Sequence, residues 1–174
     1  VIEGEQDYSD LYPGMEDIFY NGFQEGAKTG NQDIDSYLNF EHSQLTIITG
    51  APGSGKSTLG NYMYVELARN HGWKFAMFSP EFGNVQYHIR QLVRQYTGKC
   101  MPSDVRVIEE KHGVRVSDSQ IMSLEEYQEA YNFCSKHFFL FDLKKADKEK
   151  IHNSFSQAVK RHGVNAVVVD PFNK

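Results

Sequence analysis

The feature that most constrains this 174-residue chain is the loop at residues 50–57 (GAPGSGKS), which matches the pattern GxxxxGK[ST] in full. Residues 44–49 (QLTIIT) just before it are apolar and β-branched, which predicts a buried strand. Residues 56–70 predict a helix that is closed by His71-Gly72. A strand, this loop and a helix in that order form a phosphate-binding unit, so we expect the chain to bind a nucleotide.

The residue types of this loop suit a triphosphate. Glycines let the backbone N–H groups turn toward phosphate oxygens, and the positive end of the following helix points at the same place. We expect Lys56 to reach the β- and γ-phosphates and Ser57 to offer its hydroxyl to Mg²⁺, so ATP and Mg²⁺ are the expected cofactors. The expected nucleotide-binding residues are Gly50, Ala51, Pro52, Gly53, Ser54, Gly55, Lys56, Ser57 and Thr58.

Strands and helices alternate along the rest of the chain. Apolar runs predict further strands at residues 73–78, 137–141 and 166–169. Helical spacing and end signals predict helices at residues 84–96, 123–136 and 147–162, and shorter ones at 11–22, 34–40 and 103–112. Strands that are apolar throughout and separated by helices form a parallel sheet covered on both faces, so the predicted fold class is α/β.

Two carboxylates follow predicted strands and are candidate catalytic partners of Lys56. Asp170 ends the strand at 166–169, and an acidic residue in that position of a phosphate-loop enzyme holds Mg²⁺, usually through water. Glu81 follows the strand at 73–78, at the sheet edge where ligands bind, and could polarise water for attack on the γ-phosphate. The alternative interpretations are a strand-end Asp that caps a turn and a surface Glu that starts a helix.

Other charged groups carry weaker functional hypotheses. Arg90 and Arg94 lie four residues apart on a predicted helix and could sense phosphate or a neighbouring subunit, but solvated or salt-bridged side chains are the favoured interpretation. A basic stretch, Lys144, Lys145, Lys148 and Lys150, is typical of a hydrated helix start. The seven histidines show no metal-ligand spacing, so no zinc site is expected.

Composition places few limits on function. The formal net charge of −5 argues against a surface that binds nucleic acid everywhere, but not against a local basic channel. Cys100 and Cys134 show no CxxC pattern, which predicts free thiols in a reducing compartment. No apolar run approaches membrane-spanning length, so no membrane association is expected. The chain lacks an initial Met and a signal peptide, which suggests a piece of a longer intracellular polypeptide.

Three further stretches carry a family likeness. Residues 26–50 contain GAKTG, IDSY and QLTIITG; residues 78–99 contain FSPE, HIR and YTGK; residues 167–173 read VVVDPFN. In this order they resemble the motor domain of hexameric replicative DNA helicases of the DnaB and Twinkle type, including phage primase-helicases. His42-Ser43 departs from the Pro-Gly that this family usually has before the first strand.

The resemblance implies a RecA-like P-loop NTPase fold. Residues 1–30 would be a linker whose short helix docks on the next subunit, and residues 31–174 the N-terminal part of the ATPase core, ending after the Walker B strand. Lys56, Glu81 and Asp170 match the family's catalytic positions, and Ser57 and Asp170 its metal positions. The implied partners are single-stranded DNA, bound through regions beyond residue 174, and further copies in a ring, as a hexamer; an adjoining primase domain is left open.

Three alternatives remain open from the sequence. The first is another RecA-like ATPase, of the recombinase or clock type; the second is a small-molecule kinase, with residues 99–122 as its lid. The third is a nucleotide-binding assembly fragment without activity. The expected location is intracellular, either the cytoplasm (that of the host for a phage protein) or the mitochondrial matrix.

Overall fold

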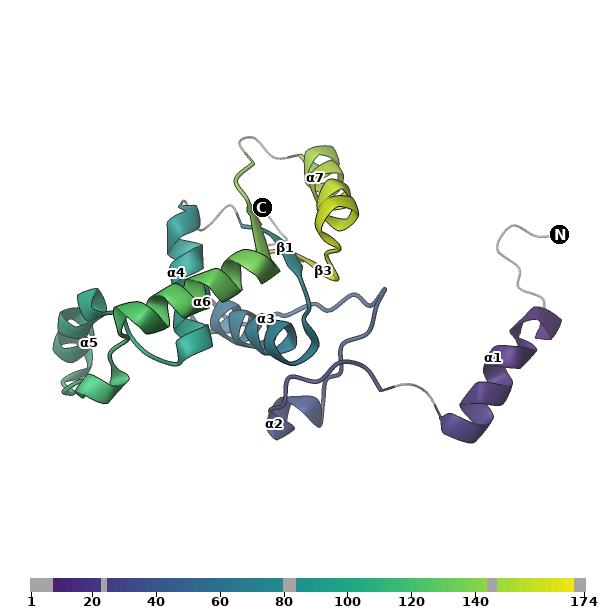
Figure 1. Cartoon of the computed structure of the whole chain (residues 1–174), viewed down its shortest axis with the longest axis horizontal. Coiled ribbons are helices and arrows are strands. Elements are labelled where there is room, and N and C mark those ends of the chain that lie inside the picture. The colour runs from purple at the N-terminus through teal and green to yellow at the C-terminus, as the bar shows by residue number, and fades with distance from the viewer. Residues whose placement is uncertain (1–7, 23–24, 80–83, 144–146, 171–174) are drawn as a thin grey trace.

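The computed structural model describes residues 8–22, 25–79, 84–143 and 147–170 (Figure 1). Its helices are α1 (Tyr8–Asn21), α2 (Gln32–Asp35), α3 (Lys56–His71), α4 (Val85–Thr97), α5 (Val105–His112), α6 (Leu124–His137) and α7 (Lys148–His162). Its strands are β1 (Phe75–Phe78), β2 (Phe138–Phe141) and β3 (Ala166–Val169), and 3-10 turns lie at Pro102–Asp104 and Asp118–Gln120.

The three strands form one parallel sheet in the order β2-β1-β3. Phe75 of β1 pairs with Phe138 of β2 and with Ala166 of β3, so the strands start level with one another. Alternate residues of a strand point to opposite faces. Met77 accordingly joins the larger hydrophobic cluster, and Phe78 joins the smaller one beneath α7.

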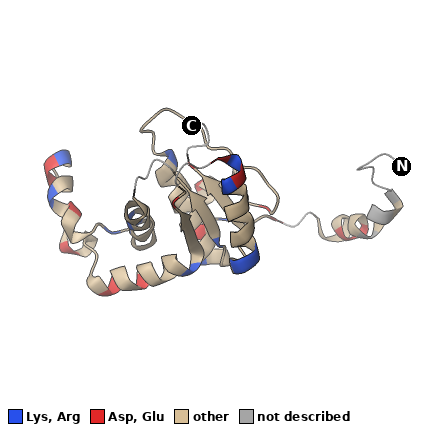
Figure 2. Ribbon diagram, turned by 90° about the horizontal axis from the view of Figure 1, so that it is seen from above, with Lys and Arg blue, Asp and Glu red and all other residues tan. Residues whose placement is uncertain are grey.

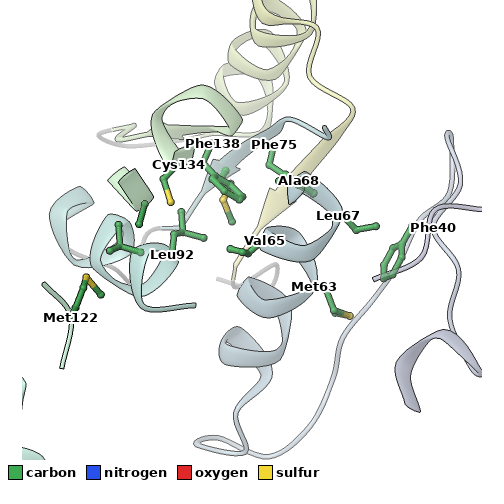
Figure 3. Packing of buried hydrophobic residues seen from close by; sticks show 13 residues of the cluster. Phe40, Met63, Val65, Leu67, Ala68, Phe75, Leu92, Met122, Cys134 and Phe138 are labelled. Carbon is green, nitrogen blue, oxygen red and sulfur yellow. The ribbon is translucent and has the colours of Figure 1, made fainter. Parts of the chain in front are cut away.

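The larger cluster packs α3, α4 and α6 against one face of the sheet (Figure 3). Val65 of α3, Leu92 of α4 and Ala130 of α6 are fully buried there. The smaller cluster places Phe155 and Ala158 of α7 on the other face. The prediction of an α/β fold with a parallel sheet and helices on both faces is therefore confirmed.

Local end signals explain where the helices stop and start. Gly72, Gly98 and Gly163 follow α3, α4 and α7 with φ between 64° and 68°, a left-handed conformation that glycine adopts without a Cβ clash. Ser123 and Glu126 form a capping box at the start of α6. These signals set the helix lengths, and hence the sheet edge at which each connecting loop lies.

The strand predicted at residues 44–49 is wrong. The structure gives this segment no strand partner, and Leu45 and Ile47 are 83% and 73% exposed. A strand needs a neighbour that takes up its backbone hydrogen bonds, and the described pairs of the sheet join β1 only to β2 and β3. The apolar pattern alone could not supply that neighbour, so the observed sheet has three strands, not four.

Residues 25–43 form a strap across α3. Ala27 and Phe40 make an antiparallel bridge, and the Asn70 side-chain amide donates to the Thr29 carbonyl at 2.7 Å. Both carboxylate oxygens of Asp35 accept hydrogen bonds from the Thr29–Gly30 turn. The short helix predicted at residues 34–40 is misplaced, because Asn31 caps the helix and starts it at Gln32.

Helix α1 confirms the helix predicted at residues 11–22, although it starts earlier. It lies apart from the rest of the chain in both views (Figures 1 and 2). Several of its large apolar side chains are exposed: Tyr12, Met15, Phe19 and Tyr20. Helix α1 therefore leaves large apolar side chains on its surface.

Candidate nucleotide and metal site

The phosphate-binding loop turns sharply into α3. Gly53 and Gly55 have φ values of 74° and 89°, which only glycine adopts readily. Gly55 is the N-cap residue of α3, and the Ser54 amide donates to the Ala51 carbonyl at 3.2 Å. The free N–H groups of the first turn of α3 therefore open onto the loop, an arrangement that favours an anion.

Lys56 folds over this loop. Its Nζ donates to the carbonyl oxygens of Gly50 and Ala51, both at 2.9 Å. The ammonium group thus lies over the concave side of the loop, beside the N-terminus of α3. This position is compatible with the predicted role of Lys56 at the phosphates, where stronger charge-assisted contacts would replace those to the carbonyls.

Ser57 and Asp170 meet at the carboxyl edge of the sheet. The Ser57 hydroxyl donates to Oδ2 of Asp170 at 2.7 Å, although the two residues lie 113 positions apart. Asp170 is held there because its amide continues the ladder beyond β3 and donates to the Phe78 carbonyl at 3.1 Å. The structure thus brings together two of the residues that the sequence singled out.

The chemistry of this pair fits Mg²⁺. A hydroxyl oxygen and a carboxylate oxygen are hard ligands, and Mg²⁺ binds through one or two protein groups together with phosphate oxygens and water. Ser57 is exposed and Asp170 half-buried, so the pair is open to a nucleotide at the loop. Among the described residues, no group of three or more His, Cys, Asp or Glu side chains is arranged to hold a metal without such help.

Two side chains near Asp170, those of His88 and Tyr64, were not predicted from the sequence as site residues. His88 on α4 is 5% exposed; burial lowers its pKa to about 4, and the negative charge of Asp170 opposes that shift. Burial raises the pKa of Tyr64 on α3 to about 12, with a smaller push from Asp170. His88 could have been recognised from its spacing, since it lies four residues before the buried Leu92.

Glu81 lies outside the described residues, so its position relative to the loop stays a prediction. The described chain before it ends at Ser79, just after β1 and at the same sheet edge as Asp170. A cavity of about 180 Å³ opens at this edge, lined by Ser79, Asn84, His88 and Asp142 among others. Its walls come from the ends of β1 and β2 and the start of α4.

Arg90 and Arg94 do not point to the nucleotide loop. Both pair with Asp104, which is 9% exposed, and Arg94 Nε lies 3.9 Å from its Oδ2. The salt-bridged interpretation of these arginines is therefore confirmed. In the basic stretch, Nζ of Lys150 lies 3.5 Å from Oδ2 of Asp147, the residue that caps α7. Lys144 and Lys145 lie outside the described residues.

The described helices include none that is both long and apolar enough to cross a membrane.

Comparison with known proteins gives one family. Residues 26–173 match the family described as DnaB-like helicase C terminal domain. The Twinkle homolog protein, chloroplastic/mitochondrial, of Arabidopsis thaliana is 29% identical over 164 residues, which cover 91% of this chain and 22% of that relative. No solved structure gives a significant match.

The chain spans about a fifth of the length of this curated relative, since the match covers 22% of it. The family match spans the nucleotide loop, the sheet and all of the helices after α1. On this match and on its three-stranded parallel sheet, the chain belongs to the DnaB-like helicase C-terminal domain family and has a RecA-like α/β fold.

Proposed function

We propose that this chain is the ATP-binding and ATP-hydrolysing motor domain of a hexameric replicative DNA helicase. The observation that carries the proposal is the contact of Ser57 with Asp170 beside the Lys56 loop, in a chain of the DnaB-like family. A loop without an acidic strand end would support nucleotide binding alone. The carboxylate adds the metal position that phosphoryl transfer needs.

The loop and Asp170 would share the binding of the nucleotide and its metal ion. The backbone N–H groups of residues 50–58, apart from Pro52, which has none, wrap the triphosphate, and Lys56 neutralises charge on its terminal phosphates. Ser57 and Asp170 would hold Mg²⁺, with Asp170 acting through water, and the ion would supply positive charge beside the phosphate oxygens. The role of the chain's own residues is to bind and orient the nucleotide.

Glu81 is the proposed general base. It would accept a proton from the water that attacks the γ-phosphate. Its support is its place in the sequence, two residues after Ser79 at the sheet edge that carries Asp170. A water-activating carboxylate favours an ATPase over a small-molecule kinase, whose acceptor is not water.

We propose that the linker joins neighbouring subunits into a ring. Helix α1 leaves Phe19 and Tyr20 80% and 74% exposed and lies apart from the core (Figure 1). We assign residues 1–30 to a linker whose helix docks on the next subunit, and residues 31–174 to the ATPase core. Single-stranded DNA is the proposed track, and the cytoplasm or mitochondrial matrix the proposed location.

The test is phosphate release by the 174-residue chain and by a longer polypeptide that contains it, each with and without single-stranded DNA. We expect nucleotide binding by both and DNA-stimulated hydrolysis by the longer polypeptide. Transfer of the γ-phosphate to a nucleoside or another small molecule would overturn the proposal in favour of a kinase. Nucleotide binding without hydrolysis by either polypeptide would leave only an assembly role.

A further inference from the structure

The amino edge of the sheet, where its strands begin, carries basic residues, whereas the carboxyl edge carries carboxylates. The three strands start level, so the residues just before β1, β2 and β3 form a row at the amino edge: Lys74, His137 and Asn165. Helices α6 and α7 both end at this edge. Lys136 lies in the last turn of α6, and Lys160, Arg161 and His162 in that of α7.

This amino-edge face is defined by Lys74, Lys136, His137, Lys160, Arg161 and His162. The opposite edge carries carboxylates: Asp170, at the nucleotide site, follows β3, and Asp142 follows β2. Residues 67–79, 130–141 and 150–169, which form the face and the strands behind it, contain no Asp or Glu. In Figure 2 the end of α6 that meets the sheet and the lower end of α7 are both blue.

Local contacts hold the face in place. Lys74 Nζ donates to the His162 carbonyl at 2.9 Å, and its amide donates to the Asn165 side chain at 2.9 Å. The His137 ring contacts the Trp73 carbonyl through Nδ1 at 2.9 Å. These bonds connect β1 to α7 and to the α6–β2 junction, so the backbone segments that carry the cations are joined to one another at this edge.

The three outer cations are uncompensated. Lys136, Lys160 and Arg161 are exposed and form no ion pair with any described residue. The nearest carboxylate along α6 is Glu129, roughly 10 Å from Lys136 at the rise of a helix. The negative ends of α6 and α7 offset only about half a charge each, against three full charges.

Two histidine rings, those of His137 and His162, belong to the same face as these cations. The ring of His162 is stacked on Phe139 with centroids 4.2 Å apart, and His162 is exposed. The ring of His137 is stacked on Phe133 with centroids 4.5 Å apart. A packed ring beside cations offers a base somewhere to stack while the cations hold the phosphates.

We propose that the amino-edge face binds the phosphate backbone of a single DNA strand, as a contact separate from the nucleotide site. The proposed function already names single-stranded DNA as the track; this proposal adds a DNA contact on this chain itself, and that contact requires neither ATP nor a ring. The partner is argued from charge: a chain of net charge −5 gathers exposed cations here without a carboxylate beside them. Stacking rings favour a single strand over a duplex, whose bases are already stacked.

The experiment measures binding of a fluorescent oligothymidylate to the 174-residue chain by anisotropy, in EDTA and without nucleotide, across a range of salt. The test variant is Lys160→Glu/Arg161→Glu. The control is Lys111→Glu/Arg115→Glu, which makes the same charge change at exposed positions elsewhere. We expect the test variant to lose at least about tenfold in affinity, and its salt slope to fall by about 1.4, at about 0.7 per phosphate contact on a single strand.

Two further measurements keep the proposal falsifiable if the test variant misfolds. On the unchanged chain, the oligonucleotide should protect Lys136 and Lys160 from acetylation but not Lys111. Lys56→Ala should retain DNA binding while it loses ATP, which separates this proposal from the helicase assignment. An equal loss in the control variant, protection of Lys111 alone, or displacement by polyglutamate at equal charge would overturn it.

Discussion

The Ser57 hydroxyl donates a 2.7 Å hydrogen bond to Oδ2 of Asp170, and this contact joins the start of α3 to the end of β3. Both residues sit at the carboxyl edge of a parallel sheet, where such folds bind their ligands. Because Asp170 also donates its amide to the Phe78 carbonyl, the contact is fixed by the strand ladder. A hydroxyl oxygen and a carboxylate oxygen are thereby placed together next to the phosphate-binding loop.

Asp170→Asn should weaken the effect of Mg²⁺ on nucleotide binding. The amide oxygen can still accept the Ser57 hydrogen bond, so the fold should persist, but the negative charge is lost. We expect the gain in ATP affinity on adding Mg²⁺ to shrink about tenfold or more, equivalent to about 1.4 kcal/mol. Titration of a fluorescent ATP analogue with Mg²⁺ and with EDTA measures this. Asp142→Asn, after β2 at the same edge, is the matched control and should leave the gain unchanged.

Lys56→Ala should reduce ATP affinity. The ammonium group lies over the loop, and charge-assisted hydrogen bonds contribute about 1.5–3 kcal/mol each, so a loss of at least about tenfold follows. Calorimetry with ATP and Mg²⁺ measures it. Lys148→Ala, an exposed lysine at the start of α7, should bind as the unchanged chain does. Unaltered affinity in Lys56→Ala would contradict the assigned contact with phosphate.

Glu81→Gln should separate binding from hydrolysis. Glutamine has nearly the same size but cannot accept the proton of the attacking water, and general-base catalysis contributes about 10²–10⁴-fold. We expect ATP affinity within about threefold of the unchanged protein and a loss of at least about 100-fold in phosphate release. The measurement uses the longer polypeptide with DNA present. Hydrolysis at the unchanged rate would show that another group activates the water, and Glu125→Gln, at an exposed position in the first turn of α6, provides the control.

Much of the fold was predictable because its signals are local. The strand predicted at residues 166–169 agrees with β3 residue for residue, and the glycines at 98 and 163 in the sequence end α4 and α7. Apolar runs bounded by glycines and caps give element type without reference to the rest of the chain. The parallel sheet then follows from the alternation of strands and helices.

Residues 44–49 show the limit of such patterns. Their β-branched sequence predicts a buried strand, but Leu45 and Ile47 are exposed and the segment has no strand partner in the structure. A local sequence pattern indicates only a preference for extended backbone. Strand pairing also requires that the tertiary fold place another strand next to the segment. The same limit applies to His88, whose burial near Asp170 depends on how α4 packs on α3.

Asp104→Ala should destabilise the fold. Its carboxylate is 9% exposed and is shared by Arg90 and Arg94, so removing it leaves two half-buried cations without their partner. Breaking a fully buried pair costs about 3–5 kcal/mol; because these arginines are about a third exposed, we expect about 1–3 kcal/mol in urea melts. Glu110→Ala removes the partner of Arg106 in the exposed pair on α5 and should cost less than about 1 kcal/mol.

His88 should make the chain less stable in mild acid. Burial lowers the pKa of His88 to about 4, and the negative charge of Asp170 opposes this shift. In the unfolded chain a histidine has a pKa of about 6.5. Between these values the unfolded chain binds more protons, so the His88 contribution to the unfolding free energy is complete above about pH 6.5 and is lost as pH falls toward 4. His88→Gln should remove this dependence, whose slope is at most about 1.4 kcal/mol per pH unit. Urea melts from about pH 7 to about pH 4.5 compare the two, with His152→Gln, at an exposed position of α7, as the control. Parallel loss of stability in His88→Gln and the unchanged chain would mean that other groups, such as the hydrogen-bonded carboxylate of Asp35, carry the acid sensitivity.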